Sequence, residues 1–87
     1  MNPVVQAQVR KHFEQRLRLK GDASALDDAD PLFSTARLDS LDAVETIMFV
    51  EEAFGIDFAE INYDLTLLDS VSAIAHLVEQ RSSMRAA

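Results

Sequence analysis

Apolar residues recur at helical spacing in three segments of this sequence, and no segment alternates them in the manner of a β-strand. The interval is clearest near the start, where one apolar stripe consists of Val5, Val9, Phe13 and Leu17. Gly21 ends that stripe. The pattern predicts an all-α fold: a small four-helix bundle with three main helices, one short helix and a long first loop.

The bundle is expected to be a single domain over residues 1–87, because a chain of this length has room for one core of modest size. Its predicted elements are a first helix at about 3–19, a loop at 20–38, a second helix at about 40–54, a short helix at about 58–63 and a last helix at about 70–82. Loops this long are uncommon in compact domains and are often functional. We expect Leu32 and Phe33 to anchor this one against the core.

Charge is distributed unevenly along the chain. The net charge is −7, but residues 1–20 alone carry +4, so the remainder carries −11. Such a surface repels phosphate backbones and attracts basic protein surfaces, which argues against nucleic acid as a partner. No apolar run is long enough for a membrane span, and no signal-peptide pattern is present. We therefore expect a monomer in the cytoplasm.

The sequence offers no constellation of catalytic or metal-binding residues. It has no cysteine, His76 has only Glu79 three residues on, and neither His12 nor His76 belongs to a cluster with ligand spacing. Glu51 and Glu52 are adjacent on a predicted helix, so their side chains point about 100° apart and do not form an acid/base pair. We expect no metal site, no catalytic residue and no enzymatic activity.

The remaining candidate is Ser40, at the head of the second predicted helix. Asp39 is placed to cap this helix, and Asp42 sits where the acid of a capping box belongs. Capping alone explains the similar Asp-Ser pair at Ser70, but Ser40 follows a long loop and precedes an acid-edged apolar strip. Unpaired N–H groups and the helix dipole favour an anion at such a position, and Arg37 is the nearest cation that could support it.

The second predicted helix has two apolar faces. At about 100° per residue, the face expected in the core consists of Ala43, Ile47, Val50 and Phe54. The strip on its flank consists of Leu41, Val44 and Met48. The residues expected on the outer side are Asp42, Glu45, Phe49 and Glu52.

These residues resemble the acyl carrier protein family, because Asp39-Ser40-Leu41 looks like its Asp-Ser-Leu modification motif and the similarity is strongest over residues 32–58. The resemblance implies that a phosphopantetheinyl transferase attaches 4′-phosphopantetheine from coenzyme A to Ser40. Acyl groups would be carried as thioesters on its thiol, for fatty-acid, polyketide or related specialised biosynthesis. The implied partners are acyl-loading and acyl-processing enzymes with basic docking patches. The residues implied to recognise them are Leu41, Asp42, Val44, Glu45, Met48, Glu51 and Glu52.

Three positions depart from the family's pattern. Arg37-Leu38 stands where the family commonly has Gly before a small or variable residue. Thr46 replaces an apolar residue of the acyl pocket, and Phe49 is bulky where a small exposed residue is expected. Phe49 suggests a dedicated partner or, equally, packing against the third helix. Two other functions remain open: an unmodified acidic adaptor that binds partners through the second helix, and a carrier for aminoacyl units.

Overall fold

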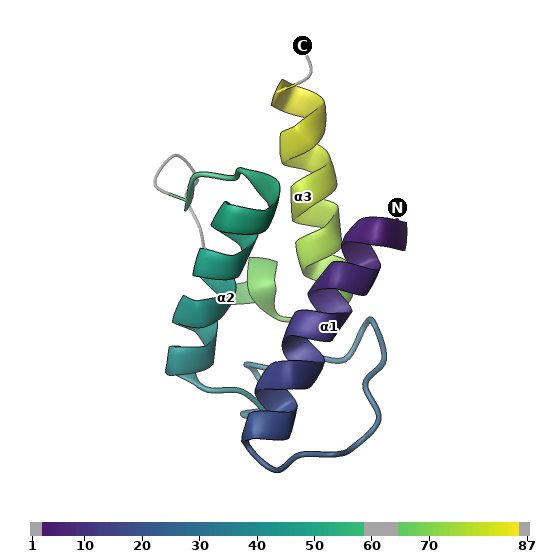
Figure 1. The fold of residues 1–87 in the computed structure, drawn as a ribbon, viewed down its shortest axis with the longest axis vertical. Coiled ribbons are helices and arrows are strands. Elements are labelled where there is room, and N and C mark those ends of the chain that lie inside the picture. Colours follow the sequence, from purple (N-terminus) through teal and green to yellow (C-terminus); the bar gives the residue numbers. More distant parts are fainter. Residues whose placement is uncertain (1–2, 59–64, 86–87) are drawn as a thin grey trace.

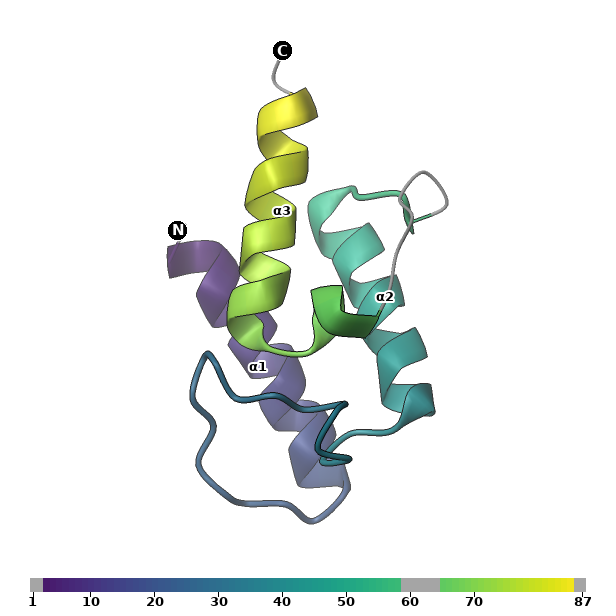
Figure 2. The same cartoon turned by 180° about the vertical axis from the view of Figure 1, so that it is seen from behind.

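The computed structural model describes residues 3–58 and 65–85, and within these ranges it contains helices and no strand. The elements are α1 (Pro3–Leu19), α2 (Ser40–Phe54), the 3-10 helix η2 (Leu65–Leu68) and α3 (Val71–Arg85). Figure 1 shows α1 and α3 side by side, with α2 on the other side of the core. Figure 2 shows η2 between α2 and α3. The predicted all-α fold of the carrier type is confirmed, with a 3-10 turn as its short helix.

Two elements near the C-terminus differ from the expected ranges. The last helix begins at Val71 and continues to Arg85, beyond the expected end near residue 82. The short helix expected at 58–63 lies outside the described residues except for Phe58. The short helix that the structure describes is η2, which follows this segment.

The apolar stripe of α1 forms the centre of the core. Val9, Phe13 and Leu17 are buried, because their four-residue spacing keeps them on one side of the helix. Phe13 packs edge-on against Phe33 of the long loop, with ring centroids 6.2 Å apart. Leu32 is also fully buried, so the predicted anchoring of the loop by Leu32 and Phe33 is confirmed.

The long loop is also held by hydrogen bonds to the carboxylate of Asp69, just before α3. Its Oδ1 accepts the backbone N–H groups of Leu32, Phe33 and Ser34 at 3.1, 2.6 and 3.0 Å, and its Oδ2 accepts the Ser34 hydroxyl at 2.7 Å. Partial burial alone would raise the pKa of Asp69, but these hydrogen bonds outweigh it and the pKa is lowered. Ser70 has the capping role expected of it, because its Oγ accepts the N–H of Ala73 at 3.0 Å.

The side of α2 that is buried differs from the predicted side by a rotation about the helix axis. Ala43 and Val50 are buried as expected, whereas Ile47 and Phe54 are only half-buried. The polar edge of the helix is buried instead, with Asp42 2% exposed and Thr46 0% exposed. The expectation that Asp42 lies on the outer side is therefore wrong. His12 and Arg16 of α1 supply the hydrogen bonds that make the burial of Thr46 and Asp42 tolerable.

Candidate functional site

Ser40 is the first residue of α2, and its side chain is exposed. A capping box sets the backbone around it. Asp39 Oδ1 accepts the N–H groups of Leu41 and Asp42, each at 3.1 Å, and Asp42 Oδ2 accepts the N–H of Asp39 at 3.0 Å. The predicted capping box is confirmed, and it explains why the helix begins at Ser40.

The capping box also changes what the head of α2 can offer to an anion. Of the four N–H groups that a helix start leaves free, those of Asp39, Leu41 and Asp42 are already bonded to carboxylates. Within the described residues, the Ser40 N–H is the one that has no partner. An anion attached to Ser40 therefore meets one free N–H group and the helix dipole, fewer donors than expected from the sequence.

The cation at the head of α2 is Lys20, at the end of α1. Its Nζ lies 2.8 Å from Asp39 Oδ2 and 3.0 Å from Asp42 Oδ2. The hydrogen bonds to Asp39 and then Asp42 raise the pKa of Lys20, and the hydrogen bond from Lys20 lowers the pKa of Asp39. Both groups are thus charged at neutral pH, and the negative charge beside Ser40 is neutralised within the chain.

Arg37 does not have the role expected of it. Its Nε bonds Asp22 Oδ2 at 3.1 Å and its Nη1 lies 3.7 Å from Asp30 Oδ2, so the side chain is committed to the acids of the loop. The hydrogen bond from Arg37, together with the backbone N–H of Ser24, lowers the pKa of Asp22 to about 2. The residue before Arg37, Ala36, has a φ of 62°, a left-handed conformation that L-residues adopt at a cost. Arg37 therefore stabilises the loop through its ion pairs. The cation at the head of α2 is Lys20, not Arg37.

Three polar side chains at four-residue intervals, two on α1 and Lys20 just after its end, meet two on α2 and its N-cap Asp39. His12 pairs with Thr46, Arg16 with Asp42 and Lys20 with Asp39, at distances of 2.9, 2.9 and 2.8 Å. The partners follow in reverse order along the chain because the two helices run in opposite directions (Figure 1). We call this series the α1–α2 ladder. The sequence interpretation missed it, although the interval of four between His12, Arg16 and Lys20 was a signal that could have revealed it.

Asp42, one of the predicted recognition residues, is buried in the ladder and is not on the surface. Its carboxylate is 2% exposed and is paired with both Arg16 and Lys20, so it acts inside the fold. Glu51 is half-buried, and its Oε2 accepts the N–H of Phe58 at 3.2 Å. The predicted recognition residues that the structure does expose on α2 are Leu41, Val44, Glu45, Met48 and Glu52.

Phe49 and Thr46, two of the departures from the family pattern, are both explained by His12. The Phe49 ring is half-buried and stacks on the His12 ring, with centroids 4.4 Å apart and planes 6° apart, so it packs against α1. The Thr46 hydroxyl donates its hydrogen to Asp42 O at 2.7 Å and therefore accepts from His12 Nε2. Burial lowers the pKa of His12 to about 4, assisted by the charge of Arg16 and opposed by that of Asp42. His12 is thus neutral at pH 7.

An open apolar pocket of about 530 Å³ adjoins Ser40. The loop and the first turns of α2 form its walls, which besides Asp39 and Ser40 consist of Phe33, Ala36, Leu38, Ala43 and Val44. Asp39 and Ser40 are the polar residues that line it. The pocket suits a partly apolar group that is attached at the serine.

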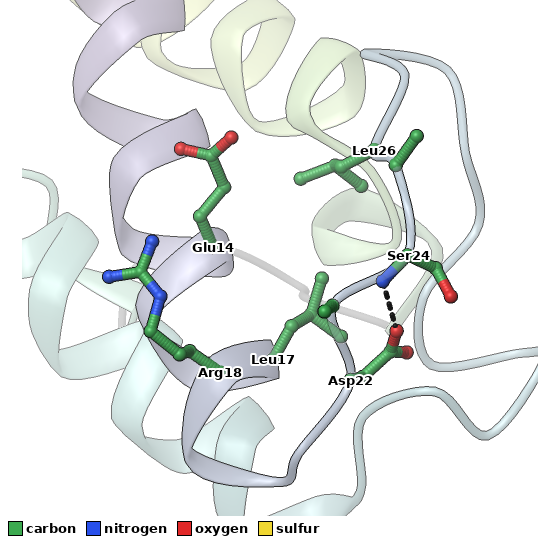
Figure 3. A pocket seen from close by; sticks show the side chains of 8 residues that line it. Glu14, Leu17, Arg18, Asp22, Ser24 and Leu26 are labelled. Atoms are coloured by element: carbon green, nitrogen blue, oxygen red, sulfur yellow. Dashed lines mark hydrogen bonds between the residues drawn. The ribbon is translucent and has the colours of Figure 1, made fainter.

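A second pocket, of about 310 Å³, lies between α1 and the start of the loop (Figure 3). Its polar residues are largely committed, since Asp22 accepts the N–H of Ser24 at 2.9 Å and also binds Arg37. Leu17 and Leu26 form its apolar part. In the part of the chain that the structure describes, no three His, Asp or Glu residues are grouped to hold a metal. We assign no chemistry to this pocket.

One comparison with known proteins gave a match. The family model described as phosphopantetheine attachment site matches residues 7–78, which is most of the chain. Neither the curated proteins nor the solved structures gave a match. Among the helices of residues 3–58 and 65–85, none combines the length and apolar character needed to cross a membrane. The chain belongs to the phosphopantetheine attachment site family, and it is a carrier protein for the covalent prosthetic group 4′-phosphopantetheine.

Proposed function

We propose that Ser40 Oγ bears the phosphopantetheine and that the chain carries acyl groups as thioesters for fatty-acid, polyketide or related specialised biosynthesis. The observation that supports this assignment is the contrast between two serines that each follow an aspartate at a helix start. Ser70 is half-exposed, and its hydroxyl caps α3. Ser40 is exposed, and Asp39 performs the capping in its place. The Ser40 hydroxyl is therefore available for modification without loss of a cap.

The residues around Ser40 fit the group. The free N–H of Ser40 and the positive end of α2 favour a phosphodiester there, and the apolar walls contributed by Leu38 and Val44 are the surfaces that the arm would meet first. Once attached, the arm supplies a terminal thiol that forms thioesters, which this cysteine-free chain itself lacks. The chain's own part is to position the arm and to present it to enzymes, so we propose that it is not an enzyme itself.

The buried hydroxyl of Thr46 affects where an acyl chain on the arm could lie. Its side chain is 0% exposed, and its hydroxyl is bonded to both His12 and Asp42 at the position where carriers have an apolar residue of the acyl pocket. An acyl chain entering there would have to displace a satisfied buried polar pair, at a cost of roughly 1–3 kcal/mol. We therefore propose that the cargo is short or polar, or that it remains outside the bundle.

The expected partners are the transferase and acyl-processing enzymes with basic surfaces. Glu45 and Glu52 are exposed and edge the strip of Leu41, Val44 and Met48, an arrangement suited to cationic, partly apolar docking patches. The expected state is a monomer, and the expected location is the cytoplasm. An unmodified adaptor would use the same helix. It has no need of an exposed serine that plays no capping role and lies beside an apolar pocket.

Intact-mass measurement after incubation with coenzyme A and a broad-specificity phosphopantetheinyl transferase tests the proposal. We expect a gain of one phosphopantetheinyl group in the wild type and in Ser70→Ala, and no gain in Ser40→Ala. A wild-type chain that gains no mass would support the adaptor. A gain that persists in Ser40→Ala would place the attachment elsewhere. Loading of the modified chain with acyl or aminoacyl groups would then separate the two kinds of carrier.

A further inference from the structure

The acidic groups near Ser40 are compensated from within the chain. Asp39 and Asp42 are paired with Lys20 and Arg16, and two of the loop acids are paired with Arg37. A partner's cation that approached Asp39 would have to compete with Lys20 Nζ, which lies 2.8 Å from its carboxylate. The end of α2 that holds the serine is therefore a poor electrostatic target for a basic enzyme.

The uncompensated charge lies farther along α2. Glu45 and Glu52 are exposed and, among the described residues, form no ion pair. Seven residues separate them, so they lie about two turns apart on the same side of the helix. Both line a groove of about 280 Å³ between α1 and α2, opposite Gln15 of α1. Arg16 also borders this groove, but its charge is paired with Asp42.

The same groove has an apolar part that comes from both helices. Leu19, at the end of α1, is 76% exposed, more than any other large hydrophobic side chain described. It lines the groove together with Met48, which is 54% exposed, and with the half-buried ring of Phe49. Met48 also belongs to the apolar strip that leads back toward Ser40, so the two surfaces are continuous. An exposed apolar patch edged by uncompensated acids is typical of a protein-binding site.

We propose that the phosphopantetheinyl transferase docks in this α1–α2 groove, with an apolar side chain between Leu19 and Met48 and with cations against Glu45 and Glu52. This inference rests on the proposed function and extends its recognition surface from α2 to α1. The distance is compatible with action at the serine. Met48 is eight residues from Ser40, about 12 Å along the helix axis, and a standard interface of about 800 Å² per partner covers both.

Steady-state kinetics of the modification, with the carrier as the varied substrate, tests the contribution of Leu19. We expect Leu19→Ser to raise KM about fivefold to tenfold while kcat stays within about twofold, because Leu19 touches no reacting atom. Val4→Ser is the matched control, since Val4 is 63% exposed at the other end of the same helix. A KM for Leu19→Ser equal to that of Val4→Ser would overturn the proposal. Both changes are at exposed positions, and circular dichroism verifies that the variants are folded.

Charge substitutions give a second measurement. Glu45→Gln and Glu52→Gln should each raise KM about threefold or more at low salt, and the difference should shrink as salt is added. Glu14→Gln on α1 is the control, because Glu14 lies on the second pocket and not on the groove. Equal KM values for all three variants would show that the groove acids do not guide docking.

Methyl NMR locates the contact directly. Titration of the Ser40→Ala chain with the transferase should shift or broaden the methyl signals of Leu19 and Met48 and leave those of Val4 unchanged. Shifts confined to Leu41 and Val44 would assign docking to α2 alone and overturn the role of α1. Failure of the proposed function has a different signature, because then the wild-type chain gains no mass with any transferase.

Discussion

The Nε of Arg16 lies 2.9 Å from Oδ1 of Asp42, a carboxylate that is only 2% exposed. This pair is the middle step of the α1–α2 ladder, between His12–Thr46 and Lys20–Asp39. The ladder connects the end of α1 to the head of α2, where the capping box holds Ser40. The position of the proposed attachment site therefore depends on α1 as well as on the helix that contains it.

Asp42→Ala tests the contribution of this pair to stability. Removing the carboxylate leaves Arg16 with a half-buried unpaired charge and takes away one half of the capping box. We expect a loss of about 3 kcal/mol in the free energy of unfolding, measured by urea denaturation. Glu45→Ala, at an exposed position of the same helix, should change it by no more than about 0.5 kcal/mol. A similarly small change for Asp42→Ala would show that the pair adds no net stability.

His12 should make stability depend on pH above the range in which carboxylates titrate. Its pKa is about 4 in the folded chain and about 6.5 when exposed, so the unfolded chain binds the proton more readily between these values. The free energy of unfolding should therefore fall as the pH falls from about 6.5 to about 4. The full difference in pKa corresponds to roughly 3 kcal/mol, but the ring is partly exposed and solvent screening reduces this to about 1–2 kcal/mol.

Urea denaturation at pH 7 and pH 5 measures this dependence. His12→Phe retains the stacking on Phe49 and removes the titrating group, so most of the loss between the two pH values should disappear. His76→Gln, on the exposed side of α3, is the control and should behave as the wild type does. A wild-type stability that is the same at both pH values would contradict the neutral, half-buried state of His12.

Asp69 should stabilise the long loop more than Ser70 stabilises α3. Asp69→Ala removes the acceptor of the Phe33 and Ser34 N–H groups, while the N–H of Leu32 keeps its bond to the backbone carbonyl of residue 69 at 2.8 Å, and we expect a loss of about 2–3 kcal/mol. Ser70→Ala removes a single cap and should cost about 1 kcal/mol. Amide hydrogen exchange gives a local readout, since the Phe33 N–H should exchange faster in Asp69→Ala and not in Ser70→Ala. Equal exchange in both variants would show that Leu32 and Phe33 hold the loop by packing alone.

The predictions that succeeded from sequence concern local patterns. The stripe of Val9, Phe13 and Leu17 lies in the core, because the spacing of side chains on a helix is a property of the helix itself. The capping box of Asp39 and Asp42 formed for a similar reason, since its hydrogen bonds connect residues three apart. The sequence predicts Leu32 and Phe33 as loop anchors because they are large apolar residues that follow a run of turn-forming aspartates, and both are buried.

The predictions that failed concern contacts between helices. Asp42 was expected outside and Arg37 beside Ser40, but Asp42 is buried against Arg16, and Arg37 binds Asp22 of the loop. Charge and periodicity along one helix do not indicate which side of it another helix will cover. A buried carboxylate is tolerated only where cations reach it, and those cations belong to a segment more than twenty residues earlier in the chain.

The sequence therefore predicts the three main helices, the capping box of α2 and a serine at its head, because these follow from the order of residues within one turn or one stripe. Which acids remain outside depends on how the helices pack against one another. The register of α1 against α2 brings His12, Arg16 and Lys20 opposite Thr46, Asp42 and Asp39, and so neutralises the serine end of the helix. Glu45 and Glu52 form no ion pair among the described residues, because Arg16, the cation that borders their groove, is paired with Asp42, and the free negative charge therefore lies along the groove that Leu19 and Met48 share.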